Sequence, residues 1–302
     1  EIKNNVFLKR EDLQPVFSFK LRGAYNKISL LKEKGDVERV ITASAGNHAQ
    51  GVAYSARKLK LKSTIVMPVT TPSIKVKAVK NLGAKVVLVG DSYDDAYVHA
   101  IKLSKNPKFA FVHPFDDPDV IAGQGTIGKE ILDECDKKID AVFVPVGGGG
   151  LIAGVGAYIK NLKPRIKIIG VEPKEAAGLY ESIKANRRVT LKEVGLFVDA
   201  VAVKQVGKVT FPIIKECIDE VVTVTVDEIC AAVEDIFQET RSISEPAGAL
   251  SLAGLKKLAK SRKWKNKNLV AINSGANLNF DRLSHIVERV QLGEKKEALL
   301  SV

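Results

Sequence analysis

The chain has 302 residues, is 45% hydrophobic and 27% charged, and carries a formal net charge of +12. This composition is typical of a globular protein, and at roughly 150 residues per domain the length predicts two domains. No apolar run approaches the ~18 residues of a membrane span, and the lysines are not gathered among aromatic residues as on a nucleic-acid-binding face, so we expect neither a membrane nor a nucleic-acid partner.

Short apolar runs rich in β-branched residues recur along the chain and predict strands. Their hydrophobicity is continuous rather than alternating, which is typical of strands buried on both faces of a parallel sheet. The runs are residues 39–43, 63–68, 85–90, 109–113, 141–146, 167–171 and 269–273. Stretches with helical periodicity separate them, for example residues 51–61 and 74–82. This alternation predicts an α/β protein with open, mostly parallel sheets.

The spacing of these strand–helix units changes along the chain and predicts where the domains divide. Units between about residues 37 and 127 are short and regular, whereas later units lengthen and the final third, from residues 221–225 onward, is rich in helices. The segment before residue 37 is too short to form a domain of its own. We therefore predict a large domain from residues 1–36 and 128–302 and a small domain from residues 37–127.

Four consecutive glycines follow the predicted strand at 141–146 and precede a helical stretch at 152–161. Glycines let backbone N–H groups converge on an anion, and the following helix adds its positive N-terminus. The spacing matches neither a Walker loop nor GxGxxG. The pattern favours a cradle for the phosphate of a small cofactor over a flexible linker. This glycine turn consists of Gly147, Gly148, Gly149, Gly150 and Leu151.

A second strand-to-helix junction carries small and polar residues and predicts a carboxylate site. Its first residue, Ser44, is expected to cap the following helix, whose N-terminus would receive the carboxylate. Asn47 supplies a neutral donor and acceptor, although an ordinary capped turn is the alternative. This SAGNH segment consists of Ser44, Ala45, Gly46, Asn47 and His48.

Two further segments are weak signals alone but become candidate parts of the same site when taken together with the glycine turn and the SAGNH segment. Lys20 lies in the run SFKLRGA, and taken alone it would be a surface charge. Ser274 begins SGAN after the predicted strand at 269–273, at the end of a parallel strand where ligands bind in open α/β sheets. The scattered histidines and cysteines show no metal-ligand spacing, so we predict no metal site.

These segments together resemble the fold-type II pyridoxal-phosphate enzymes, and among them the threonine deaminases. The motifs KRED at residues 9–12, SFKLRGA, SAGNHAQG, GGGGL, EPAGA at residues 245–249 and SGAN follow that family's order through essentially the whole chain. The family's last motif is usually SGGN, and here Ala276 replaces its second glycine. Serine racemases share most of these motifs. A serine racemase or serine dehydratase of the same fold is therefore the alternative.

The resemblance implies a role for each segment and a tryptophan synthase β-like architecture. Lys20 would hold pyridoxal 5'-phosphate as a Schiff base, with Phe19 beside it. Asn47 would hydrogen-bond the phenolic oxygen of the cofactor, and Ser274 would contact its pyridine nitrogen. The glycine turn would hold the phosphate, and the SAGNH segment would receive the substrate carboxylate. Glu245 would contact the ligands or merely cap a helix.

The resemblance also implies the reaction, which is β-elimination of L-threonine to 2-oxobutanoate and ammonia, the first step of isoleucine biosynthesis, and of L-serine to pyruvate. Lys20 would be the catalytic base. Residues 279–302 resemble the junction to a regulatory domain that binds isoleucine and valine, which would be missing here. The relatives imply a homodimer or homotetramer. We expect a cytoplasmic enzyme, with organellar targeting open because the chain looks truncated at its N-terminus.

Overall fold

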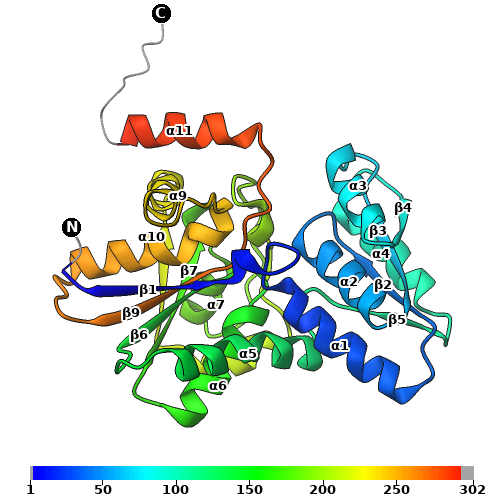
Figure 1. Ribbon diagram of the computed structural model, residues 1–302, viewed down its shortest axis with the longest axis horizontal. Helices are drawn as coiled ribbons and strands as arrows, with labels where there is room; N and C mark the ends of the chain where they lie inside the picture. Colours follow the sequence, from blue (N-terminus) through cyan, green and yellow to red (C-terminus); the bar gives the residue numbers. More distant parts are fainter. Residues whose placement is uncertain (1–2, 294–302) are drawn as a thin grey trace, which may run out of the picture.

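The computed structural model describes residues 3–293 and contains two sheets surrounded by helices (Figure 1). The five-stranded sheet has the order β1-β9-β6-β7-β8 and the four-stranded sheet the order β4-β3-β2-β5. The strands of the first are β1 (Asn5–Arg10), β6 (Ala141–Pro145), β7 (Lys167–Pro173), β8 (Glu220–Val224) and β9 (Asn268–Asn273). Those of the second are β2 (Arg39–Ala43), β3 (Lys62–Met67), β4 (Lys85–Leu88) and β5 (Phe109–Phe111). All paired strands within these sheets run parallel, which confirms the predicted α/β class.

The helices lie on both faces of each sheet. They are α1 (Lys20–Lys34), α2 (Asn47–Lys58), α3 (Ser73–Asn81), α4 (Tyr93–Leu103), α5 (Pro118–Glu134), α6 (Gly150–Leu162), α7 (Gly178–Lys184), α8 (Thr210–Cys217), α9 (Val226–Thr240), α10 (Pro246–Ser261) and α11 (Arg282–Gly293). Helices α9 and α10 cover one face of the five-stranded sheet, and α5 and α6 cover the other (Figure 1). No helix in residues 3–293 is both long and apolar enough to cross a bilayer.

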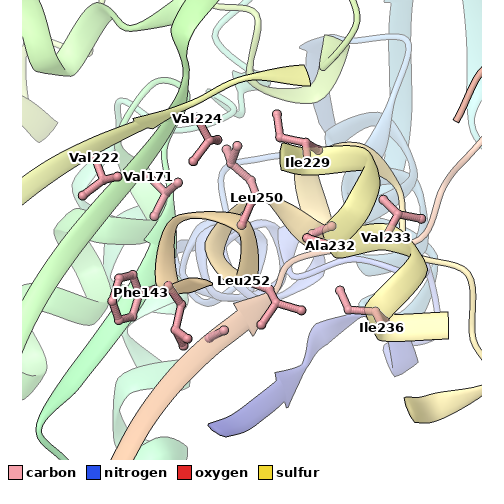
Figure 2. Close-up of a cluster of buried hydrophobic side chains, with 14 of the residues drawn as sticks. Phe143, Val171, Val222, Val224, Ile229, Ala232, Val233, Ile236, Leu250 and Leu252 are labelled. Carbon is pink, nitrogen blue, oxygen red and sulfur yellow. The ribbon is translucent and has the colours of Figure 1, made fainter. Parts of the chain in front are cut away.

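Strand β6 shows why the predicted strands are continuously apolar. All five of its residues are buried. Phe143 packs with α9 and α10 in one core cluster (Figure 2), whereas Val142 and Val144 pack with α5 and α6 in another. Successive side chains of a strand point to opposite faces, so a strand covered by helices on both faces must be apolar at every position.

Local sequence signals set several helix ends. Helix α9 begins with a capping box, in which the Thr225 hydroxyl accepts from the Glu228 N–H and the Glu228 carboxylate accepts from the Thr225 N–H. Asp117 caps α5 immediately before Pro118, which needs no N–H partner at that position. Helix α1 ends at Lys34, and the next residue, Gly35, has a φ of 81°, a left-handed conformation that suits glycine.

Helix α1 connects the two sheets. The strand before it, β1, pairs with β9 at the edge of the five-stranded sheet. The buried face of α1, with Ala24 and Ile28, instead packs with Val40 and Val52 beneath the four-stranded sheet. Residues on either side of position 36, where the predicted small domain begins, therefore share one hydrophobic core. The domain boundaries given by the sequence remain a prediction.

Candidate active site

Two segments that are far apart in the sequence meet beside Lys20, the first residue of α1. The Phe19 N–H donates to the Ser274 carbonyl oxygen at 3.1 Å, and the Ala276 N–H donates to the Phe17 carbonyl oxygen at 2.9 Å. Between them, Ser18 and Gly275 form an isolated antiparallel bridge. Parallel pairing of β1 with β9 brings the ends of both strands to the same edge of the sheet. Lys20 and Ser274 are therefore held close together.

Lys20 is a half-buried residue whose amine has close neighbours. Its Nζ donates to the Pro114 carbonyl oxygen at 3.0 Å and lies 5.2 Å from the centre of the Phe19 ring. Burial lowers the pKa of Lys20 to about 8, although the carboxylate of Glu245 acts in the opposite direction. A larger fraction of this amine is uncharged near neutral pH than of an exposed lysine. It is suited to nucleophilic and basic chemistry.

The glycines of the turn leave little or no space for side chains. A Cβ at Gly148 would lie 2.3 Å from the Phe115 ring, and one at Gly149 would lie 2.6 Å from the Ile214 Cδ1. Gly149 has a φ of 94° and immediately precedes α6. On the outer side, the Thr210 hydroxyl donates to the Gly148 carbonyl oxygen at 2.8 Å. Glycine is therefore required at these positions. Backbone without side chains leads into the N-terminus of α6, a helix of 13 residues. The first N–H groups of that helix have no partner within it and can bind an anion.

The SAGNH segment forms the junction from β2 to α2, as predicted, but Ser44 does not cap the helix. Helix α2 begins at Asn47, so Gly46 occupies the cap position and no side chain makes a cap hydrogen bond. Ser44 instead accepts from the Gly46 N–H at 3.3 Å. Our capping prediction was wrong because the helix begins later than the first small residues suggested. The helix N-terminus stays free of a competing side chain.

His48 is buried in the first turn of α2 and is held as a neutral ring. Its Nε2 lies 3.0 Å from the Val112 carbonyl oxygen, and its Nδ1 has no hydrogen-bond partner within residues 3–293. Burial lowers the pKa of His48 to about 3, and the nearby Lys20 charge acts in the same direction. The ring therefore does not carry a positive charge at neutral pH.

Glu245 immediately precedes α10, but its side chain makes no cap hydrogen bond. Of the two roles that the sequence allowed, a ligand contact or a helix cap, the cap is therefore not formed. Its Oε1 accepts from the Asn47 Nδ2 at 2.6 Å, and the Asn47 Oδ1 accepts from the Asn277 Nδ2 at 2.6 Å. The Glu245 residue is only 5% exposed. Burial raises its pKa to about 7, although the hydrogen bond from Asn47 acts in the opposite direction.

Sequence reasoning missed the segment after β5, which supplies two contacts of the site. Pro114 accepts from Lys20, and Phe115 packs on the glycine turn. Asp116 then accepts from the N–H groups of Val209 at 2.7 Å and Thr210 at 3.2 Å, which anchors the start of α8. The segment follows a predicted strand, so its position at the carboxyl edge of a parallel sheet was a usable signal.

Within residues 3–293 no group of three or more histidine, cysteine, aspartate or glutamate side chains could hold a metal ion. Asp199 lies in the short helix η3 (Asp199–Val201). Here its carboxylate pairs with Lys75 of α3 at 3.3 Å. The part of the junction resemblance at residues 294–302 lies outside the described residues.

The sequence profile of the family described as "Pyridoxal-phosphate dependent enzyme" matches residues 1–275. The chain belongs to this family. It is 54% identical over 304 residues to the biosynthetic L-threonine dehydratase of Burkholderia multivorans, and the match covers 100% of this chain and 60% of that protein. It is 55% identical over 300 residues to the mitochondrial threonine dehydratase of Schizosaccharomyces pombe, covering 98% and 50%. The chain thus spans about half the length of the curated relatives it matches.

Solved structures support the same family assignment. The processed form of threonine deaminase isoform 2 from Solanum lycopersicum superposes with a TM-score of 0.94 at 50% identity, covering 96% of this chain and 80% of that one. The serine racemase of Dictyostelium discoideum superposes with a TM-score of 0.84 at 35% identity, covering 91% and 88%. The resemblance inferred from the motifs is confirmed at the level of the family.

The residues of this pyridoxal-phosphate family member fit its cofactor. An aldehyde needs a nearby amine that is partly uncharged, and burial gives Lys20 this property. A phosphate needs converging N–H groups without side-chain obstruction, and the packing leaves no room for a Cβ at Gly148 or Gly149, just before α6. A pyridine ring needs a hydrogen-bond partner, and Ser274, whose buried hydroxyl donates to the Ala247 carbonyl oxygen at 3.2 Å, lies at the junction beside Lys20.

Proposed function

We propose that the chain is the catalytic core of a threonine ammonia-lyase, which converts L-threonine to 2-oxobutanoate and ammonia and L-serine to pyruvate and ammonia. The observation that carries this proposal is that Lys20, whose amine has a lowered pKa, meets the SGAN segment beside the SAGNH segment. The printed names of relatives at 54% and 55% identity over nearly the whole chain support the choice of threonine.

When bound, pyridoxal phosphate supplies an electron sink for the charge that develops on the substrate Cα. Lys20 would anchor the cofactor, and its amine, once displaced by the substrate amine, would remove the Cα proton. The low pKa of Lys20 keeps part of this amine ready to accept a proton at neutral pH. The proton lost from Cα and the hydroxide lost from Cβ together amount to one molecule of water. The resulting enamine becomes its imine tautomer, and addition of water to that imine gives the keto acid and ammonia.

The other residues would bind and orient the ligands. The N–H groups of the glycine turn would bind the cofactor phosphate, and the SAGNH segment at the start of α2 would bind the substrate carboxylate. Ser274 would offer a hydroxyl to the pyridine nitrogen. A hydroxyl leaves that nitrogen largely uncharged, whereas a carboxylate would keep it protonated. This favours prompt elimination over a long-lived carbanion.

A serine racemase is the second candidate, because the structure of one such enzyme superposes with a TM-score of 0.84. Racemisation requires a second acid or base on the opposite face of Cα. The deciding experiment supplies the purified chain with pyridoxal phosphate and either L-threonine or L-serine, and measures keto acid and D-serine. We expect 2-oxobutanoate from threonine, and D-serine as the main product would refute the proposal.

The anchoring role of Lys20 has its own test. Borohydride reduction of the cofactor-loaded protein fixes the cofactor to the amine that holds it, and peptide mapping identifies that residue. We expect the label on Lys20, and label on another lysine would refute the assignment.

We further propose a homodimer or homotetramer in the cytoplasm. Relatives named mitochondrial and chloroplastic make an organelle the alternative location.

A further inference from the structure

Glu245 is a buried acid to which the proposed reaction assigns no role. Its main chain belongs to the five-stranded part of the molecule, since the Glu245 N–H donates to the Gly275 carbonyl oxygen at 3.1 Å. Its side chain reaches Asn47 at the start of α2, next to the four-stranded sheet. A Cβ at Gly275 would lie 2.5 Å from the Glu245 Oε1, so that glycine gives the carboxylate its space. Glu245 therefore links the two sheets across the site.

The Asn47 amide is held at both of its ends. Its nitrogen donates to Glu245 and its oxygen accepts from the Asn277 nitrogen, both at 2.6 Å. Asn277 is fixed in turn, because the same nitrogen donates to the Val16 carbonyl oxygen at 2.8 Å. An amide has two N–H groups, and Glu245 is the one hydrogen-bond partner of the Asn47 nitrogen within the part of the chain that the structure describes. The second N–H is available to a ligand, in an orientation that Glu245 and Asn277 set.

Three charged groups act on the Glu245 carboxyl. Lys20 of α1 and Lys75 of α3 favour its ionised form, and Asp199 of η3 disfavours it. Lys75 and Asp199 are paired with each other at 3.3 Å, so their opposite effects partly cancel. Burial is the largest influence and raises the pKa of Glu245 to about 7. The Glu245 carboxyl therefore changes its charge closer to neutral pH than an exposed glutamate does.

We propose that Glu245 is a positioning residue: together with Asn277 it orients the Asn47 amide, and gain or loss of its proton alters the hydrogen bond that Asn47 offers to the bound cofactor. This proposal rests on the proposed function, because that function places the cofactor beside Asn47. An ionised carboxylate holds the Asn47 N–H with a charge-assisted bond that is roughly twice as strong as a neutral one. Protonation weakens this hold without breaking it.

The test follows the visible absorbance of the pyridoxal-phosphate-loaded protein as the pH is raised from below the Glu245 pKa to above it. We expect the wild type to show a transition as the carboxyl loses its proton, at a pH above the ordinary range of a glutamate because burial raises the pKa of Glu245. Glu245→Gln keeps an oxygen that accepts from Asn47 but cannot ionise, so its spectrum should resemble the low-pH wild-type spectrum at every pH. A wild type without a transition, or an unchanged transition in E245Q, would overturn the proposal.

Two further variants separate positioning from general stability. Glu172→Gln changes another buried glutamate, whose carboxylate accepts from the N–H groups of Leu179 and Tyr180 at 2.8 Å. It should keep the wild-type transition. Asn277→Ala releases the far end of the Asn47 amide and should raise the Kd of pyridoxal phosphate about tenfold, the effect of one lost buried hydrogen bond. An unchanged Kd in N277A would refute the orienting role.

The spectrum also separates this proposal from the proposed reaction. If the protein forms no keto acid from threonine but shows the transition and loses it in E245Q, the reaction is refuted and the role of Glu245 stands. If keto acid forms while E245Q keeps the transition, the role of Glu245 is refuted and the reaction stands.

Discussion

The substitution Gly148→Ala tests whether the glycine turn is a rigid cradle. The added Cβ would lie 2.3 Å from the Phe115 ring, closer than non-bonded carbon atoms can approach. The ring or the turn must move, and overpacking of this kind costs about 1–3 kcal/mol of the free energy of unfolding. Gly148 has no left-handed φ, so alanine brings no backbone strain and the effect is purely steric.

We expect two measurable results from G148A. The midpoint of thermal unfolding should fall by roughly 2–4 °C for each kcal/mol lost. The Kd of pyridoxal phosphate, measured by absorbance titration, should rise about tenfold for each ~1.4 kcal/mol by which the displaced N–H groups bind the phosphate less well. Gly178→Ala is the matched control, because a Cβ there meets its nearest atom at 3.7 Å, an ordinary contact.

A double-mutant cycle identifies the cause of the effect. Phe115→Ala removes the ring that the new methyl group would strike, so the G148A change should cost less in the F115A background than in the wild type. A G148A variant with unchanged thermal midpoint and unchanged Kd would refute the steric account of the turn. Additive losses in the double variant would show that the Phe115 ring is not the obstacle.

Three other outcomes follow from the site. Lys20→Ala should lower the rate of keto acid formation by at least about 10²–10⁴-fold, the usual contribution of a general base; a rate near that of the wild type would remove Lys20 from catalysis. His48 has a folded-state pKa of about 3 against 6.5 for a free histidine, so the unfolded chain binds the extra proton first and the free energy of unfolding should fall as the pH drops below 6.5. Urea denaturation at several pH values should show a smaller fall for His48→Gln, and an equal fall would contradict this account. Thr210→Val removes the hydroxyl that donates to the Gly148 carbonyl oxygen at 2.8 Å and should cost about 0.5–1.5 kcal/mol in the same assay, whereas no loss would show that the hydroxyl does not brace the turn.

Much of the fold could be predicted from local patterns. The predicted runs at 39–43 and 141–146 agree with β2 and β6 to within one residue. Strands buried on both faces are apolar at every position, and this signal needs no knowledge of their neighbours. The order of the strands within each sheet was not predictable in the same way. It depends on pairings such as that of β1 with β9, which are more than 250 residues apart.

The sequence by itself determined the class of the fold, the strand-to-helix junctions and the family, because glycine runs, periodicity and motif order are properties of short segments. Only the tertiary structure decided how these segments meet. It revealed the Pro114 contact of Lys20 and the hydrogen bonds that join Glu245 to Asn47 and Asn277. It also determined the environment of each charge. Burial sets the pKa of Lys20 and of Glu245, and burial is a property of the packed molecule that no single segment carries.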